Sequence, residues 1–282
     1  MIFSKKSISN SETNINVLVF SGIHGNETSG IEANKKLATQ IIKGEIKILR
    51  GSLTLVLEAN EQAIEKGVRE VEKNMNRLFT DNIKNTCYEE ARAIDLMKLI
   101  RESNYLLDLH STSGPSIPFA YAEENSLELA KKIGINNIIS GWGKLSEKKG
   151  NNNIAGDTEN YMNKKGGQAI TFEAGNHNNP NGAEISYKIL LNFLATLGII
   201  EKKYYKIIEG EKTHTKITGY YTAKTNSFKY AIKAENFMRL KKGTLIGYDG
   251  GLEVKAEEDM ILVMPKKEEI VREGIEVFFK GK

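Results

Sequence analysis

Short runs of β-branched and apolar residues alternate with helix-length segments over the first 200 residues of this 282-residue chain. Residues 16–23 (NVLVFSGI) predict a buried strand, and residues 28–42 place apolar side chains at helical spacing. The alternation continues in further predicted strands and helices at residues 52–57, 88–102, 105–109, 127–133, 169–172 and 185–197. Such an alternation indicates an α/β fold, with a mixed, mostly parallel sheet flanked by helices.

The pattern changes near residue 200. Short alternating segments follow at residues 203–208, 215–222 and 251–254, separated by several glycines, and no long helical pattern is present. We therefore expect a catalytic α/β domain over residues 1–200 and a smaller β-rich domain over residues 201–282. The length of 282 residues fits one large domain or two unequal ones.

Composition excludes several classes of protein. The 40 Lys and Arg exceed the 36 Asp and Glu by a net charge of +4, and the excess is spread along the chain, so we expect no nucleic-acid partner. No apolar run approaches the roughly 20 residues that span a bilayer, so we expect no membrane association. The single cysteine, Cys87, and the polar segment from Met1 to Asn16 predict a cytoplasmic protein without a signal peptide. The oligomeric state stays open, with a homo-oligomer among the alternatives.

Two histidines follow predicted strands. His24 comes after the first strand with Glu27 three residues later, and His110 ends the strand at residues 105–109. Because the carboxyl ends of parallel strands share one edge of a sheet, these side chains can meet there. Two imidazoles and one carboxylate supply three of the four ligands of a catalytic zinc and leave the fourth position for water. The pattern thus predicts one Zn²⁺ per chain.

The same residues have simpler interpretations. His24 can be a loop histidine, with Glu27 as a first-turn carboxylate favoured by the helix dipole. His110 can be a core histidine whose buried partner is Asp108, with no metal present.

A hydrolytic zinc site also needs a base and cations. Glu173 ends the strand at residues 169–172 and is a candidate for the base that moves the proton of the attacking water. Asp108 lies two residues before His110, so both side chains lie on one face of a strand, and Asp108 can orient the imidazole.

Only seven arginines occur in the chain, so each is informative. Arg69 and Arg77 are candidates for stabilising a tetrahedral intermediate. Asn76 and Arg77 together can hold a substrate carboxylate through paired hydrogen bonds. Arg77 can also be a structural ion-pair residue, and Glu173 a strand-end acid held by backbone amides.

The order of these motifs resembles a known family. His24-Gly25-Asn26-Glu27, Asn76-Arg77, Asp108-Leu109-His110-Ser111-Thr112 and Glu173-Ala174-Gly175 are similar to motifs of the aspartoacylase and succinylglutamate desuccinylase family. That family is a branch of the zinc carboxypeptidase superfamily. The motifs span residues 22–175, and the β-rich tail is similar to the family's second domain.

The resemblance implies a role for each residue. It implies that the two histidines and Glu27 bind zinc and that Glu173 is the general base and acid. It also implies that Arg69 polarises the scissile carbonyl, and that Asn76 and Arg77 hold the substrate's α-carboxylate. The expected function is a zinc-dependent amide hydrolase that removes an acyl group from an N-acylated amino acid or similar small amide, by Glu-assisted attack of zinc-bound water.

Two departures from the family concern specificity. Its aspartate-specific members use a further arginine before the catalytic Glu, whereas residues 111–173 contain no arginine. They also use a tyrosine near the C-terminus, and none follows Tyr248. Acetylaspartate is therefore a poor candidate substrate. We expect a lysine or backbone amides between Lys144 and Lys165 to line the part of the pocket where those members have their further arginine. Residues 146–157 are expected to form a loop at the rim of the pocket.

Two other functions compete. A zinc metallocarboxypeptidase acting on small peptides or cell-wall peptides would use the same metal ligands and differ in the size of its pocket. A non-catalytic binding module would keep the fold without the reaction. His177 and His214 lack convergent partners in the sequence, and we expect both at the surface.

Overall fold

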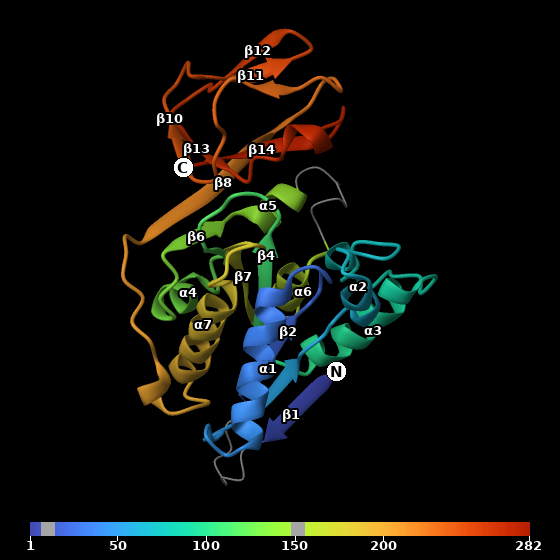
Figure 1. Cartoon of the computed structure of the whole chain (residues 1–282), viewed down its shortest axis with the longest axis vertical. Helices are drawn as coiled ribbons and strands as arrows, with labels where there is room; N and C mark the ends of the chain where they lie inside the picture. The colour runs from blue at the N-terminus through green and yellow to red at the C-terminus, as the bar shows by residue number, and fades with distance from the viewer. Residues whose placement is uncertain (7–14, 148–155) are drawn as a thin grey trace.

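The fold is an α/β unit joined to a β-rich C-terminal unit, seen in a computed structural model that describes residues 1–6, 15–147 and 156–282 (Figure 1). The strands of the α/β unit are β1 (Ile2–Lys6), β2 (Asn16–Ser21), β3 (Ser52–Val56), β4 (Tyr105–Thr112), β5 (Phe119–Tyr121), β6 (Asn137–Ser140) and β7 (Gln168–Asn176). Its helices are α1 (Thr28–Ile42), α2 (Glu61–Lys66), the 3-10 helix η1 (Met75–Arg77), α3 (Tyr88–Arg101), α4 (Leu127–Lys132), α5 (Trp142–Glu147), α6 (Thr158–Lys164) and α7 (Gly182–Thr196).

The predicted mixed α/β fold is confirmed. The strands of this unit have the order β1-β3-β2-β4-β7-β5-β6 in one sheet, in which β3, β2, β4 and β7 are parallel neighbours. β5 runs antiparallel to β7, which makes the sheet mixed. Helix α1 has the predicted bounds. β2 ends two residues earlier than predicted, because Gly22 adopts a φ of +72° and turns the chain.

Helices cover both faces of the central strands. Val17 and Val19 of β2 belong to the hydrophobic cluster under α1 and α7, while Leu18 and Phe20 belong to the cluster under α3 and α6. Successive side chains of a strand point to opposite faces, so a strand buried on both faces is continuously apolar. The result is a three-layer arrangement that fixes the carboxyl ends of β2, β4 and β7 (Figure 1).

The C-terminal unit is the segment that follows residue 212, and part of it extends the same sheet. Its elements are β8 (Thr213–Thr222), β9 (Lys229–Tyr230), β10 (Met238–Leu240), β11 (Leu245–Asp249), β12 (Leu252–Lys255), β13 (Met260–Val263), the 3-10 helix η3 (Glu268–Ile270) and β14 (Glu276–Gly281). β8 pairs in parallel with β6 and antiparallel with β14, and β13 and β10 continue the large sheet. β12, β11 and β9 form a separate three-stranded sheet. The domain boundary near residue 200 stays a prediction, because β8 bonds to strands of both units.

One predicted segment is wrong. Residues 203–208 do not form a strand, since the 3-10 helix η2 (Lys202–Tyr204) and irregular chain occupy this region. The hydroxyl of Tyr204 donates to the carbonyl of Glu45 at 2.7 Å, and that of Tyr205 donates to the carbonyl of Lys132 at 2.8 Å. Tyr204, Tyr205 and Ile208 pack on the α/β core, whereas Ile207 is 80% exposed.

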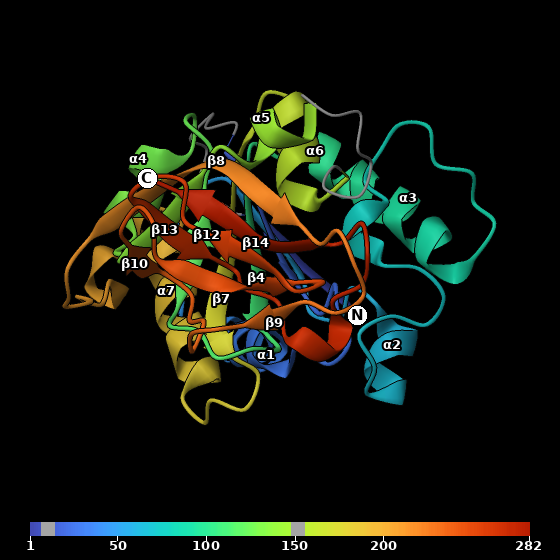
Figure 2. The ribbon, with the colours of Figure 1, turned by 90° about the horizontal axis from the view of Figure 1, so that it is seen from above.

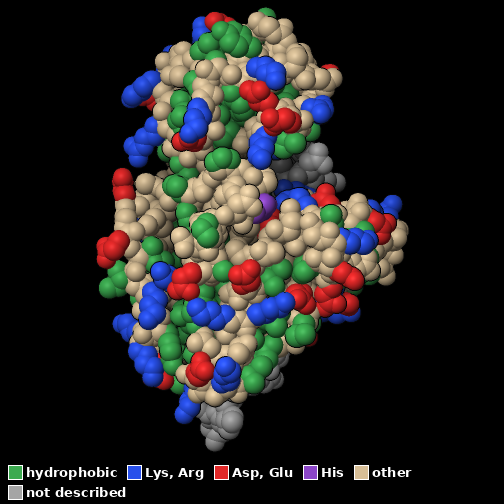
Figure 3. All heavy atoms as spheres, viewed as in Figure 1, with side chains coloured by type: hydrophobic (Ala, Val, Ile, Leu, Met, Phe, Trp, Pro, Cys, Tyr) green, Lys and Arg blue, Asp and Glu red, His purple; other side chains and the backbone are tan. Residues whose placement is uncertain are grey.

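The C-terminal unit is stacked above the carboxyl ends of β4 and β7 (Figures 1 and 2). At the junction Phe237 packs against Phe119 of β5, with 5.5 Å between the ring centroids. Figure 3 shows a histidine and basic side chains at the surface along this boundary. Among the residues that the structure describes, no helix combines the length and apolar character needed to cross a membrane.

Candidate active site with a metal-binding group

The loop after β2 places His24 and Glu27 at the carboxyl edge of the sheet. Gly25 permits this loop to lie against α2, since a Cβ on Gly25 would fall 2.2 Å from the carbonyl carbon of Ala63. The amide of Gly25 also donates to the carbonyl of Arg69 at 3.1 Å. Glu27 directly precedes α1, so the spacing of three residues turns both side chains of the motif inward.

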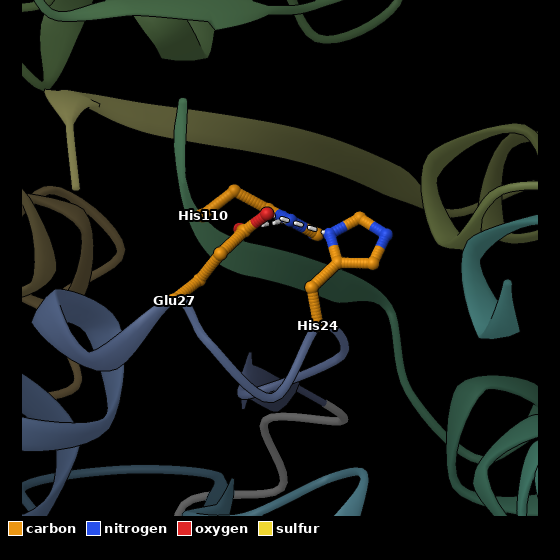
Figure 4. A group of neighbouring side chains, drawn as sticks. All are labelled: His24, Glu27 and His110. Carbon is orange, nitrogen blue, oxygen red and sulfur yellow. Dashed lines mark hydrogen bonds and ion pairs between the residues drawn. The ribbon is translucent and has the colours of Figure 1, made fainter. Parts of the chain in front are cut away.

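His24, Glu27 and His110 converge in the interior, as Figure 4 shows. Glu27 Oε1 lies 2.8 Å from His24 Nδ1, and Glu27 Oε2 lies 2.9 Å from His110 Nδ1. The three residues are only 4%, 2% and 3% exposed. Their potential ligand atoms all lie within 4.8 Å of one another.

The Nε2 atom of each imidazole lies near a side-chain oxygen. His24 Nε2 lies 3.1 Å from Asn74 Oδ1, which also accepts the backbone amide of Asn76 at 3.0 Å and is thereby identified as the oxygen. His110 Nε2 lies 3.0 Å from Asp108 Oδ2, a close contact without the geometry of a hydrogen bond. A neutral imidazole donates through one nitrogen, so with the proton on Nε2 each Nδ1 directs its lone pair at Glu27. In that tautomer a metal ion between the imidazoles and the carboxylate would satisfy both groups, whereas in the other tautomer each Nδ1–H donates to Glu27 directly.

The charges of this group follow from burial and mutual contact. Burial opposes ionisation of Glu27, but His24 and His110 hold its pKa well below its usual range. Burial lowers the pKa of His24 despite the nearby Glu27. His110 behaves differently, because Asp108 and Glu27 outweigh its burial and raise its pKa well above the ordinary value. Two imidazoles and a carboxylate so arranged fit Zn²⁺.

Glu173 stands beside this group. It pairs with His110 in the parallel register of β4 and β7 and with Phe119 in the antiparallel register of β5. Burial and the neighbouring charge of Glu27 raise the pKa of Glu173 to about 8. Within the described parts of the chain, its buried Oε2 has no hydrogen-bond partner.

The two predicted arginines take different positions. Arg69 Nη1 donates to Glu27 Oε1 at 3.0 Å, so this guanidinium lies at the metal-binding group. Arg77 Nη1 donates to the carbonyl of Asn76 at 2.6 Å, at the end of η1. The Asn76 side chain accepts the amide of Thr158 at 3.3 Å. Burial lowers the pKa of Arg77, which Asp157 partly offsets.

Comparison with known proteins identifies a family. Residues 13–197 match the family model described as the succinylglutamate desuccinylase/aspartoacylase catalytic domain. The chain belongs to this family.

Individual relatives extend the comparison. A succinylglutamate desuccinylase of Pseudoalteromonas atlantica is 30% identical over 133 residues, which cover 40% of this chain and 37% of that protein. The chain thus matches well under half the length of this curated relative. A solved succinylglutamate desuccinylase/aspartoacylase from Rhodobacter sphaeroides superposes with a TM-score of 0.76 at 19% identity, covering 95% of this chain and 85% of that one. The Vibrio cholerae succinylglutamate desuccinylase structure gives 0.76 at 21% identity, covering 96% and 82%.

Sequence reasoning missed two residues of this family member's site. His177, expected at the surface, is half-buried, and its Nδ1 lies 2.8 Å from the hydroxyl of Ser111, the neighbour of His110. Burial lowers the pKa of His177, and the charges of Glu27 and Arg69 act on it as well. Asn74 is the second, through its contact with His24. The spacing of residues in the sequence could not reveal either contact, because the two partners of each contact lie 50 or more residues apart.

The remaining expectations have mixed outcomes. His214 is exposed, as predicted, and its Nε2 lies 2.8 Å from the Ser140 hydroxyl. Thr158 Oγ1 donates to Asp108 Oδ2 at 2.6 Å, so Asp108 contacts both His110 and α6.

The predicted rim loop at residues 146–157 falls largely outside the described residues. Lys165, at the end of the segment expected to supply a pocket wall, pairs with Asp81 at 3.0 Å.

Proposed function

We propose that the protein is a zinc-dependent amide hydrolase that removes an acyl group from an N-acylated amino acid or a similar small amide. The observation that carries the proposal is Glu27 lying between two buried imidazoles, with Glu173 opposite His110 on the next strand. Membership of the family supports the reaction class, since its relatives include proteins described as succinylglutamate desuccinylases.

His24, Glu27 and His110 would hold one zinc ion per chain. Zinc at this position supplies Lewis acidity, which activates water and polarises a carbonyl oxygen. The positive charge of a bound zinc ion would lower the pKa of Glu173, so that its carboxylate accepts the proton of the attacking water and passes it to the leaving nitrogen. Its unpartnered, buried Oε2 suits that transfer, because no other hydrogen bond among the described residues has to break first.

The two cations and Asn76 position the substrate. Arg69, beside Glu27, stabilises the negative charge that develops on the scissile carbonyl oxygen. Asn76 and Arg77 hold the α-carboxylate, since a guanidinium offers carboxylates two parallel hydrogen bonds. The contact of Asn76 with the amide of Thr158 fixes the loop that carries both residues.

The alternative is a zinc metallocarboxypeptidase acting on small or cell-wall peptides. The C-terminal unit above the carboxyl ends of β4 and β7 favours a small substrate, because Phe237 packs directly on Phe119 next to Glu173. A cytoplasmic location and the lack of a nucleic-acid partner stay predictions from the sequence.

The test is hydrolysis by the zinc-loaded protein of a panel of N-acyl amino acids beside a panel of dipeptides. Faster turnover of the acyl amino acids is expected. Faster turnover of dipeptides would favour the peptidase. Stoichiometric zinc with no turnover of either panel, and with stabilisation by an acyl amino acid, would favour a binding module.

A further inference from the structure

Residues 69–74, called the Arg69 segment below, contact the metal-binding group at both ends. At the first residue, Arg69 Nη1 donates to Glu27 Oε1 at 3.0 Å. Five residues later, Asn74 Oδ1 lies 3.1 Å from His24 Nε2. The segment forms neither helix nor strand, so its backbone amides need hydrogen-bond partners from other parts of the chain. A displacement of its middle residues would move both contacts away from the two proposed zinc ligands.

Helix α3 supplies partners for the middle of the Arg69 segment. Glu89, in the first turn of α3, accepts the amides of Val71 at 2.7 Å and of Glu72 at 3.3 Å, both through Oε1. Glu89 is 0% exposed, so water does not compete for these bonds. Hydrogen bonds from amides to a carboxylate are among the stronger ones in proteins, and the N-terminus of a helix favours a negative charge. The backbone of the segment is thus fixed directly to α3.

The next residue of α3, Glu90, makes a different kind of contact. Its Oε1 accepts Lys73 Nζ at 2.6 Å, and its Oε2 accepts the amide of Thr86 at 2.5 Å. The Lys73 side chain is 44% exposed and reaches Glu90 through a flexible stem. An ion pair through such a side chain constrains the backbone of the segment less than two bonds to its amides. Glu90 is therefore a matched control for Glu89, since both are buried carboxylates in one helical turn.

We propose that Glu89 is a positioning residue that holds the Arg69 segment against the metal-binding group. Through this segment it keeps Arg69 and Asn74 in contact with the two proposed zinc ligands described above. The inference rests on the proposed function, in which Arg69 stabilises the charge on the scissile carbonyl oxygen. Because one oxygen of Glu89 accepts both amides, the task requires an acceptor and not a negative charge. The amide oxygen of a glutamine can take the same place.

The experiment measures zinc affinity, by competition with a chromophoric chelator, and kcat/KM for an N-acyl amino acid. In Glu89→Ala we expect zinc affinity to fall about tenfold, within the range for partners that orient metal ligands. We expect kcat/KM to fall about hundredfold, the usual cost of misplacing a positioned group by about 1 Å. Glu89→Gln should restore most of both values. Glu90→Ala should stay near the parent in both, although it also loses its bonds to Lys73 and Thr86.

A double-mutant cycle with Arg69→Ala tests the route by which Glu89 acts. If Glu89 acts through Arg69, Glu89→Ala should lower kcat/KM much less in the Arg69→Ala background than in the parent protein. A loss of stability without a role in positioning would give additive effects instead.

Several results would overturn the inference. Parent-like zinc affinity and kcat/KM in Glu89→Ala is one, and equal losses in Glu90→Ala or in Glu89→Gln are others, as are additive losses in the cycle. If Glu89→Ala does not fold, Glu89→Asp replaces it in each comparison, because the shorter side chain keeps the charge and withdraws the acceptor from the two amides. Failure of the proposed function would look different: the parent would hydrolyse no acyl amino acid, while zinc affinity would still separate Glu89→Ala from Glu89→Gln.

Discussion

Glu173 on β7 lies directly opposite His110 on β4 in the parallel register of the two strands. Residues that face each other in a sheet share one face, so the carboxylate lies beside the imidazole at the strands' carboxyl ends. β5 pairs on the other side of Glu173, whose Oε2 is buried. Strand pairing alone thus sets the relation between the proposed base and a proposed zinc ligand.

Replacing Glu173 by Gln removes the proposed base while keeping its shape. We expect kcat/KM for an N-acyl amino acid to fall by about 10² to 10⁴, the usual contribution of general base catalysis. Zinc content, measured by elemental analysis, should stay at the parent value. Glu184→Gln, which alters an exposed carboxylate on α7, serves as the control. Unchanged activity of Glu173→Gln would exclude this residue as the base.

Replacing Arg77 should affect binding more than chemistry. In Arg77→Lys the charge remains, but the two-pronged contact with a carboxylate is lost, so KM should rise about tenfold or more with a smaller change in kcat. Steady-state kinetics measure both values, and Arg272→Lys on the surface is the control. A lower kcat at constant KM would instead place Arg77 at the scissile bond.

The sequence was informative wherever a functional residue follows a strand. The placement of His24, His110 and Glu173 follows from the alternation of strands and helices, because parallel strands end at one edge. Asn74 and His177 could not be foreseen, since each acts through a contact with a segment far away in the chain. The alternating segment at residues 203–208, expected in the β-rich region, forms η2 and irregular chain instead, because its tyrosine hydroxyls bond to carbonyls of the α/β unit.

Asn74 should matter for metal affinity. Its Oδ1 contacts His24 Nε2 and so orients the imidazole. Partners of this kind typically contribute 10-fold to 100-fold to metal affinity. We expect Asn74→Ala to weaken zinc binding by about this factor in competition with a chromophoric chelator. Asn178→Ala, at an exposed turn, should bind like the parent, and equal affinities in the two variants would argue against an orienting role.

The metal-free protein should lose stability as the pH rises from about 5 to 9. The pKa of Glu173 is about 8 in the folded state, above its ordinary value of 4.5, so folding favours the protonated form. Its contribution is complete below the unfolded pKa and is lost as the pH rises through the folded one. Glu173→Gln should reduce this loss by a few kcal/mol, at about 1.4 kcal/mol per pKa unit. Denaturant unfolding at several pH values measures the difference, and parallel pH profiles would contradict it.

The central claim is that His24, Glu27 and His110 bind one catalytic zinc ion per chain. The most direct measurement is zinc content together with hydrolysis of an N-acyl amino acid, before and after removal of metal by a chelator. We predict one zinc per chain, loss of activity on chelation, recovery on adding zinc, and loss of stoichiometric zinc in His110→Ala. A protein without stoichiometric zinc that hydrolyses the amide equally well in the presence of chelator would contradict the account.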